Sequence, residues 1–150
     1  MKYFVTGGAG FIGSNYVRGL LDGQWGTAVE QVTVFDAFTY AGNPHNLDSV
    51  ASDDRLSIVK GDIRDSAQIL GALDGHDVIV HFAAESHVDR SIESSSVFMS
   101  TNVLGTQQML EAAMKVSTPV FVHVSTDEVY GSIETGSWDE NEPLLPNSPY

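Results

Sequence analysis

Short apolar runs alternate along the chain with longer amphipathic segments. The short runs are rich in β-branched and aromatic residues, which is typical of buried strands. They predict strands over residues 2–6, 31–35, 56–60, 77–82 and 119–125. The longer segments repeat apolar side chains at helical spacing and predict helices over residues 11–21, 66–73 and 95–116.

Each predicted helix carries apolar side chains that mark the face it would bury. In the first helix they are Phe11, Ile12, Tyr16, Val17, Leu20 and Leu21. In the second, whose expected N-cap is Ser66, they are Ile69, Leu70 and Leu73. In the third they are Val103, Leu104, Met109, Leu110 and Ala113.

Strands that alternate with helices of this length imply βαβ units and a parallel sheet. The strands read as nearly continuous apolar runs, as a sheet covered on both faces requires. The sequence therefore predicts an α/β fold, a doubly wound Rossmann-type parallel sheet with helices on both faces. Residues 1–150 finish in a polar loop over residues 135–149. Since such folds usually continue with further strands, we expect this sheet to be truncated before its last strands and its substrate domain.

Composition limits the possible partners. The 150 residues are 42% hydrophobic and include no cysteine, which excludes a disulfide framework, a thiolate metal site and a cysteine nucleophile. The formal net charge of -13 disfavours binding to nucleic acid or to an anionic membrane. No apolar run has the length of a membrane helix or the pattern of a secretion signal, so we expect a soluble, cytoplasmic protein.

A glycine-rich segment joins the first strand to the first helix. Gly7, Gly10 and Gly13 have the spacing G-x-x-G-x-x-G. This spacing allows a tight turn, close backbone approach to a pyrophosphate and close packing of the helix. Amides at the helix N-terminus would bind the anion without lysine, which suits an acidic protein. The alternative is an ordinary glycine-rich turn, which the flanking strand and helix make less attractive.

Acidic residues follow the second and third strands. A carboxylate at Asp36 would bind ribose hydroxyls and repel a 2′-phosphate, which favours NAD over NADP. Asp62 lies at the same edge of the sheet and could meet the adenine edge. On residue chemistry alone, a turn or N-cap aspartate explains Asp62 equally well.

The fourth strand leads into small residues at 83–84 and then into Glu85, His87, Asp89 and Arg90. The small residues leave room for a ligand at the carboxyl end of the strand. The four ionisable groups could contact that ligand or form a surface ion cluster, and both interpretations stay open. We expect no metal site, because one histidine and two carboxylates on a single loop are too few ligands.

The fifth strand leads into the adjacent acids Asp127 and Glu128. Two carboxyl groups in different environments can serve as a general acid and a general base. A turn or helix N-cap pair is the alternative, and the residues by themselves do not decide between the two.

Six longer segments form a recognisable set, namely VTGGAGFIGS, DAFTYAGN, KGDIRD, HFAAESHVDRSI, TNVLGTQ and VSTDEVYGS. Together they resemble the extended short-chain dehydrogenase/reductase superfamily, and within it the dTDP-glucose 4,6-dehydratases. The glycine motif is common to the superfamily, whereas AAESHVDRSI and STDEVYG are much more specific. Related epimerases typically lack the Asp-Glu pair, and GDP-mannose dehydratases and UDP-glucuronate decarboxylases keep the Glu but not the Asp.

The resemblance implies a lyase that forms dTDP-4-keto-6-deoxyglucose and water from dTDP-glucose. NAD would take a hydride from C4 while a tyrosinate takes the O4 proton. The 4-keto group acidifies the C5 proton, which a glutamate removes as an aspartic acid protonates the departing 6-hydroxyl. The hydride then returns to C6, so NAD is regenerated and stays bound.

The resemblance also assigns roles to residues. Asp127 would be the acid, Glu128 the base, and Thr126 a partner near O4, and with Ser86 these would contact the substrate. The cofactor positions would be Gly7, Gly10, Phe11, Ile12, Gly13, Asp36, Ala37, Phe38, Thr39, Asp62, Ile63, Phe82, Ala83, Ala84, Glu85, Ser86, Thr101 and Tyr150.

The final run PNSPY resembles the approach to the family's Y-x-x-x-K motif. Tyr150 would be the tyrosine that takes the O4 proton, and the motif's lysine, which lowers the pKa of that tyrosine, has no position here. We therefore expect the N-terminal, NAD-binding part of a longer enzyme, inactive alone and a homodimer at full length. Another sugar-nucleotide epimerase or decarboxylase, or a non-catalytic NAD-binding module, is the alternative.

Overall fold

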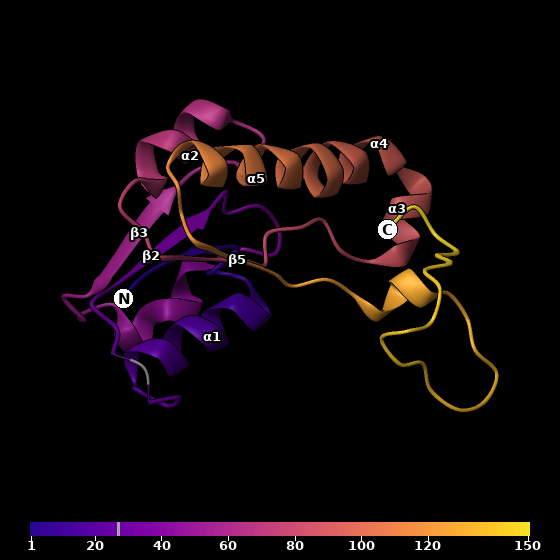
Figure 1. Ribbon diagram of the computed structural model, residues 1–150, viewed down its shortest axis with the longest axis horizontal. Helices are drawn as coiled ribbons and strands as arrows, with labels where there is room; N and C mark the ends of the chain where they lie inside the picture. The colour runs from indigo at the N-terminus through magenta and orange to yellow at the C-terminus, as the bar shows by residue number, and fades with distance from the viewer. Residues whose placement is uncertain (27) are drawn as a thin grey trace.

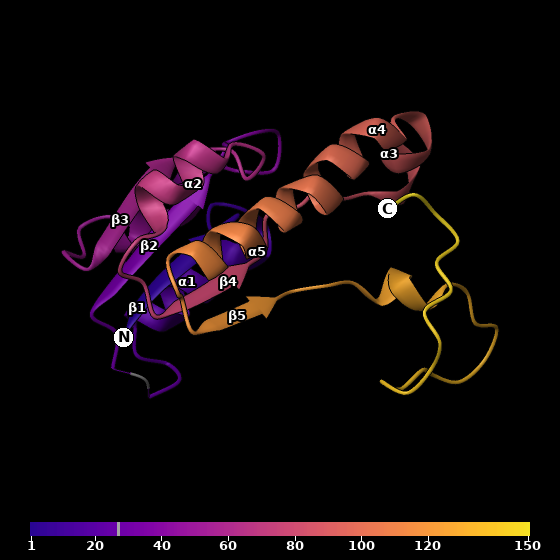
Figure 2. The same ribbon diagram turned by 45° about the horizontal axis from the view of Figure 1, so that its top comes forward.

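Five parallel strands form one sheet (Figure 1). Their order is β3-β2-β1-β4-β5, which the strand labels of Figure 2 follow. The computed structural model describes residues 1–26 and 28–150. The strands are β1 (Lys2–Thr6), β2 (Gln31–Asp36), β3 (Leu56–Lys60), β4 (Val78–His81) and β5 (Val120–His123). This strand order confirms the predicted Rossmann-type sheet.

Helices cover both faces of the sheet, which confirms the doubly wound α/β fold (Figure 1). On one face lie α1 (Phe11–Leu21) and the 3₁₀ segment η1 (Pro44–Val50). On the other lie α2 (Ser66–Leu73) and α5 (Thr106–Lys115). The alternating direction of side chains along a strand divides the core between the two layers. Tyr3 and Val5 of β1 pack on the α1 side, whereas Phe4 packs on the α2 and α5 side.

The two strands at the edges of the sheet are less covered than the sequence predicts. Val120 and Val122 of β5 are 43% and 44% exposed, and every residue of β3 is at least partly exposed. The helices therefore cover the middle of the sheet more completely than its edges. The apolar side chains of β1, β2 and β4 are buried.

One long helical segment runs from α4 (Ser95–Phe98) through the π-helical η2 (Met99–Gly105) into α5, and it extends beyond the end of the sheet (Figure 2). Its predicted buried face is only partly right. Met109 and Ala113 are buried, whereas Val103, Leu104 and Leu110 are 51%, 56% and 44% exposed. Val103 and Leu104 lie in wider π-helical turns, which break the 3.6-residue periodicity on which the prediction depended, and that half of the segment has no sheet beneath it.

The remaining exceptions lie at helix termini. Asp65, not Ser66, caps α2, since its side chain accepts hydrogen bonds from the amides of Ala67 and Gln68. Phe11 and Ile12 are exposed at the start of α1, although the sequence predicts them on its buried face.

Two further short helices are α3 (Val88–Glu93) and the 3₁₀ helix η3 (Asp127–Tyr130). Within the described residues, every helix is too short or too polar to span a membrane.

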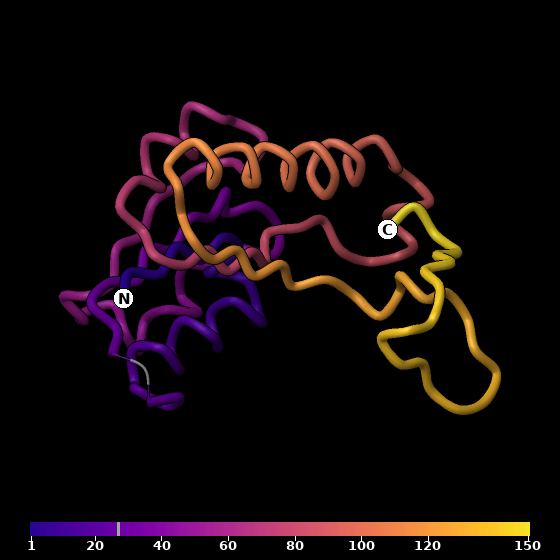
Figure 3. The backbone as a smooth tube through the Cα atoms, in the orientation of Figure 1, coloured from indigo at the N-terminus to yellow at the C-terminus, as the bar shows by residue number. Residues whose placement is uncertain are grey.

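The chain leaves the sheet after β5 and returns towards the far end of the long helical segment (Figure 3). There the ring of Tyr150 meets that of Phe98 edge to face, with 6.0 Å between the ring centroids. This contact places Tyr150 against α4.

His81 is a buried polar residue at the end of β4. Its Nδ1 lies 2.7 Å from the Thr6 hydroxyl and its Nε2 lies 3.1 Å from the Thr106 hydroxyl. The ring also stacks on that of His123, at 5.5 Å between centroids. Burial lowers the pKa of His81 to about 4, and the neighbouring His123 adds to the effect. His81 is therefore neutral in the folded protein at neutral pH.

We predict that acid weakens the fold through His81. In the unfolded chain this histidine takes up a proton near its ordinary pKa of about 6.5, whereas the folded protein resists protonation until about pH 4. The free energy of unfolding should therefore fall over this interval, by up to about 3 kcal/mol. Urea unfolding at pH 7 and pH 5 measures the slope, which should flatten in His81→Gln.

Candidate active site

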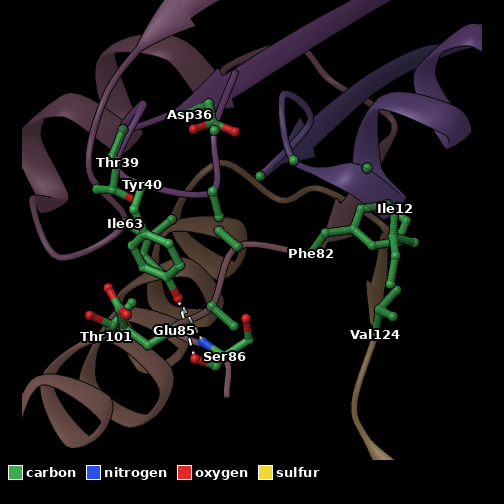
Figure 4. A pocket seen from close by; sticks show the side chains of 18 of the residues that line it. Ile12, Asp36, Thr39, Tyr40, Ile63, Phe82, Glu85, Ser86, Thr101 and Val124 are labelled. Atoms are coloured by element: carbon green, nitrogen blue, oxygen red, sulfur yellow. Dashed lines mark hydrogen bonds between the residues drawn. The ribbon is translucent and has the colours of Figure 1, made fainter. Parts of the chain in front are cut away.

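A crevice of about 580 Å³ follows the carboxyl ends of the strands (Figure 4). It is lined by residues of the glycine-rich segment 7–13 after β1, which we call the glycine loop, and by residues that follow each of the other four strands. It lies at the topological switch point between β1 and β4. The chain adds β2 and β3 on one side of β1, and then crosses over to add β4 and β5 on the other side. In open α/β sheets the switch point is where ligands bind.

Most residues predicted to bind the cofactor line this crevice. They are Gly7, Gly10, Phe11, Ile12, Gly13, Asp36, Ala37, Thr39, Asp62, Ile63, Phe82, Ala83, Ala84, Glu85, Ser86, Thr101 and Tyr150. Phe38 is different, since its side chain packs against the core on the α1 side.

Some lining residues were not among those predicted. They are Phe35, Tyr40, Ala41, Gly42, Gly61, Arg64, Val124 and Ser125. Val124 and Ser125 follow β5 directly, so the rule that ligands bind at carboxyl ends of strands would have found them. Tyr40 and Arg64 lie further into their loops, where no spacing rule applies.

The glycine loop places unpaired amides at one end of the crevice. Gly7 has a φ of 65°, and a Cβ there would lie 2.7 Å from the Ala83 nitrogen. The Gly10 amide donates to the Gly7 carbonyl, and the first hydrogen bond of α1 is from the Ser14 amide to the Gly10 carbonyl. The amides of residues 11–13 therefore precede the helical hydrogen bonds and can bind an anion.

The peptide of Ala9 holds the glycine loop in place. Its N–H donates to Oδ2 of Asp36 at 3.0 Å. Its carbonyl accepts from the Asn43 amide at 3.1 Å and from Nδ2 of Asn46 at 2.9 Å. Oδ1 of Asp36 also accepts from the Phe38 amide at 2.8 Å. Asp36 is therefore oriented by two backbone donors, and it ties the loop to β2 before any ligand binds.

Asp62 and Arg64 form an ion pair at the crevice wall beyond β3. Nη2 of Arg64 lies 2.5 Å from Oδ2 of Asp62, and Nε contacts both carboxylate oxygens at 3.0 Å. These hydrogen bonds hold the pKa of Asp62 below its ordinary range, so the carboxylate is ionised at neutral pH. The pair presents one acceptor group and one planar cation to a ligand on this side.

The loop after β4 forms the opposite wall. Asn102 brackets the backbone of Glu85, accepting from its amide at 2.8 Å and donating to its carbonyl at 3.0 Å. The Tyr40 hydroxyl contacts both backbone polar atoms of Ser86, as the dashed lines in Figure 4 show. His87 then takes a φ of 82°, which is unusual for a residue with a side chain.

Asp127 and Glu128 lie together in η3, just beyond the crevice lining. The Thr126 hydroxyl accepts from the Glu128 amide at 3.2 Å and caps this helix. The pair therefore lies at a helix N-terminus, as expected if the two acids belong to a helix cap. It also lies within three positions of Ser125, which lines the crevice. Among residues 1–26 and 28–150, no group of three or more histidines and carboxylates is placed to hold a metal ion.

A parallel sheet of this order with a glycine loop at its switch point is typical of dinucleotide-binding proteins. The chain belongs to the family described as GDP-mannose 4,6 dehydratase, which matches residues 4–150. The family covers nearly the whole chain, so it includes both the crevice and η3.

Individual relatives confirm the resemblance to dTDP-glucose 4,6-dehydratases. One from Actinoplanes sp. is 54% identical over all of this chain and 48% of its own length. The crystal structure of one from Streptomyces venezuelae, DesIV with NAD bound, is 58% identical with a TM-score of 0.98, over all of this chain and 47% of that chain. A UDP-glucose 4-epimerase from Thermus thermophilus is 30% identical with a TM-score of 0.86, over all of this chain and 46% of that chain. The chain thus spans about half the length of the relatives it matches.

We predict opposite effects of adding a methyl group at two helical glycines. In Gly13→Ala the Cβ would lie 2.3 Å from the Gly7 carbonyl oxygen, so α1 must move away from the loop, at a cost of about 2–3 kcal/mol. In Gly71→Ala of α2 the Cβ meets nothing within 4 Å, and the protein should gain about 0.5–1 kcal/mol. Urea unfolding of both variants tests this. Equal stabilities would contradict the close packing of α1 on the loop.

Proposed function

We propose that this protein is part of an NAD-dependent nucleotide-sugar 4,6-dehydratase that converts dTDP-glucose to dTDP-4-keto-6-deoxyglucose and water. The observation that carries the proposal is the adjacent pair Asp127 and Glu128, which follows the crevice lining at Ser125. Elimination of water needs a base that removes a proton from one carbon of the sugar and an acid that protonates the hydroxyl leaving the next carbon. This pair of carboxyl groups can supply both. The identities of the dTDP-glucose 4,6-dehydratases support the same conclusion.

The crevice suits NAD through its own residues. The amides of residues 11–13 would bind the pyrophosphate, and Asp36 would accept hydrogen bonds from the ribose hydroxyls. Asp62 would face the adenine with its orientation fixed by Arg64. When bound, NAD supplies the acceptor and the donor of the hydride.

The remaining roles belong to side chains that move protons. Tyr150 would take the O4 proton, Asp127 would protonate the departing 6-hydroxyl, and Glu128 would remove the proton from C5. Thr126 and Ser86 would hydrogen-bond the sugar. In support, Tyr150 and Ser86 both line the crevice, and Thr126 already orients η3 as its N-cap.

We further propose that residues 1–150 form the NAD-binding part of a longer enzyme. The substrate-binding part and the lysine that activates Tyr150 would lie beyond this chain, which would then be inactive alone. Relatives of about twice its length support this division. The protein would be a cytoplasmic homodimer, and the exposed apolar side chains of Val103, Leu104 and Met114 on the long helical segment suit a helix-pair interface.

Product analysis tests the reaction. The full-length protein, given dTDP-glucose, should form a product lighter by one water, with no accumulation of NADH. Mass spectrometry and absorbance of the reduced nicotinamide measure the two quantities. A C4 epimer of unchanged mass would show an epimerase instead, which the similarity to the Thermus thermophilus enzyme makes the natural competitor.

Replacing the acid separates the steps. Asp127→Asn removes the proton donor for the 6-hydroxyl, so dehydration should slow by at least about a hundredfold. Oxidation at C4 should continue, and reduced nicotinamide should accumulate on the enzyme. Asp74→Asn, at the exposed C-terminal end of α2, is the matched control and should leave both steps unchanged. Full dehydration by Asp127→Asn would remove Asp127 from the mechanism.

A further inference from the structure

Tyr40 joins the two walls of the crevice. Its hydroxyl donates to the Ser86 carbonyl and accepts from the Ser86 amide, both at 3.3 Å. Tyr40 belongs to the loop after β2 and Ser86 to the loop after β4, and both residues line the crevice. Figure 4 shows the tyrosine ring reaching across to Ser86.

Arg90 supports the tyrosine from outside the crevice lining. Its guanidinium carbon lies 3.7 Å from the centroid of the Tyr40 ring, which is the geometry of a cation–π contact. Nη2 of Arg90 also lies 3.9 Å from Oε2 of Glu85. That oxygen is buried and has no hydrogen-bond partner among the described residues. Glu85 therefore attracts the guanidinium towards the position it occupies on the ring. We call Tyr40, Ser86 and Arg90 the clasp.

The order of the strands places the clasp across the path of a long ligand. In the sheet, β1 lies between β2 and β4, so a link from the loop after β2 to the loop after β4 crosses the end of β1. The glycine loop begins at that end. A dinucleotide with its adenosine by Asp36 and Asp62 and its other half by Ser125 and Tyr150 must run between the clasp and this loop.

We propose that the clasp retains the dinucleotide in the crevice, with Tyr40 as the residue that must move before the cofactor can leave. This inference rests on the proposed NAD site. In the proposed reaction the hydride returns to the sugar from which it came. If the reduced cofactor left between the two hydride transfers, the oxidised sugar could not be reduced again, so the enzyme must retain the cofactor.

The contacts of Tyr40 also determine how much its loss should change the rate of cofactor release. Both hydrogen bonds are long, and Tyr40 is 50% exposed, so the clasp can open without disturbing the core. Removing two weak hydrogen bonds should therefore speed release by about three- to tenfold and should leave the folded structure intact.

Release of NADH measures the clasp directly and needs no dehydration. The full-length protein is loaded with NADH and mixed with a large excess of NAD, and the loss of bound-NADH fluorescence gives the dissociation rate constant. Tyr40→Phe keeps the ring and its contact with Arg90 but removes the hydroxyl, and its release should be about three- to tenfold faster. Arg90→Met should also speed release, because the ring loses its cation.

Tyr130→Phe is the matched control. The Tyr130 ring stacks on Trp138 at 5.8 Å and does not line the crevice, so loss of its hydroxyl should leave the release rate unchanged. An unchanged rate in a folded Tyr40→Phe protein would overturn the clasp while leaving the proposed dehydratase intact. A wild-type protein that binds no NADH would overturn the clasp together with the cofactor assignment.

Discussion

The meeting of three strands at the end of β1 sets the geometry of the whole site. The Gly7 amide donates to the Phe35 carbonyl of β2, and the Phe82 amide beyond β4 donates to the Thr6 carbonyl. Gly7 approaches Ala83 so closely that a Cβ on it would clash with the backbone. Because the walls of the crevice begin here, this packing decides how far apart Asp36, the amides of residues 11–13 and the loop after β4 lie.

In the proposed site, an acidic protein would bind a doubly negative pyrophosphate through backbone amides rather than lysines. That solution requires the amides to be held in place before the ligand arrives, since a flexible loop would pay the cost of ordering on binding. Asp36, Asn43 and Asn46 together fix the Ala9 peptide at both its polar atoms. If Asp36 binds the ribose as proposed, it would act on both ends of the site, because it also holds the glycine loop through the Ala9 amide.

The sequence was sufficient for the fold class and for most of the crevice, because the alternation of strands with helices and the glycine loop are local patterns. It was not sufficient where the outcome depends on wider helical turns, on which of two neighbouring residues caps a helix, or on a contact between distant loops. Val103 and Leu104 lie in π-helical turns beyond the sheet, and Asp65 takes the capping role that was expected of Ser66. Tyr40 could not be found, because its contact with Ser86 joins loops 46 residues apart. The roles of Asp127 and Glu128 stay predictions from resemblance.

In the proposed mechanism, one bound NAD oxidises C4 of the sugar and then, as NADH, reduces C6 of the same sugar. The most direct measurement uses dTDP-glucose carrying deuterium at C4, incubated with the full-length protein and excess unlabelled NAD. We expect nuclear magnetic resonance to find the deuterium at C6 of the product and none in the free nicotinamide pool. Deuterium retained at C4, or released into free NADH, would contradict it.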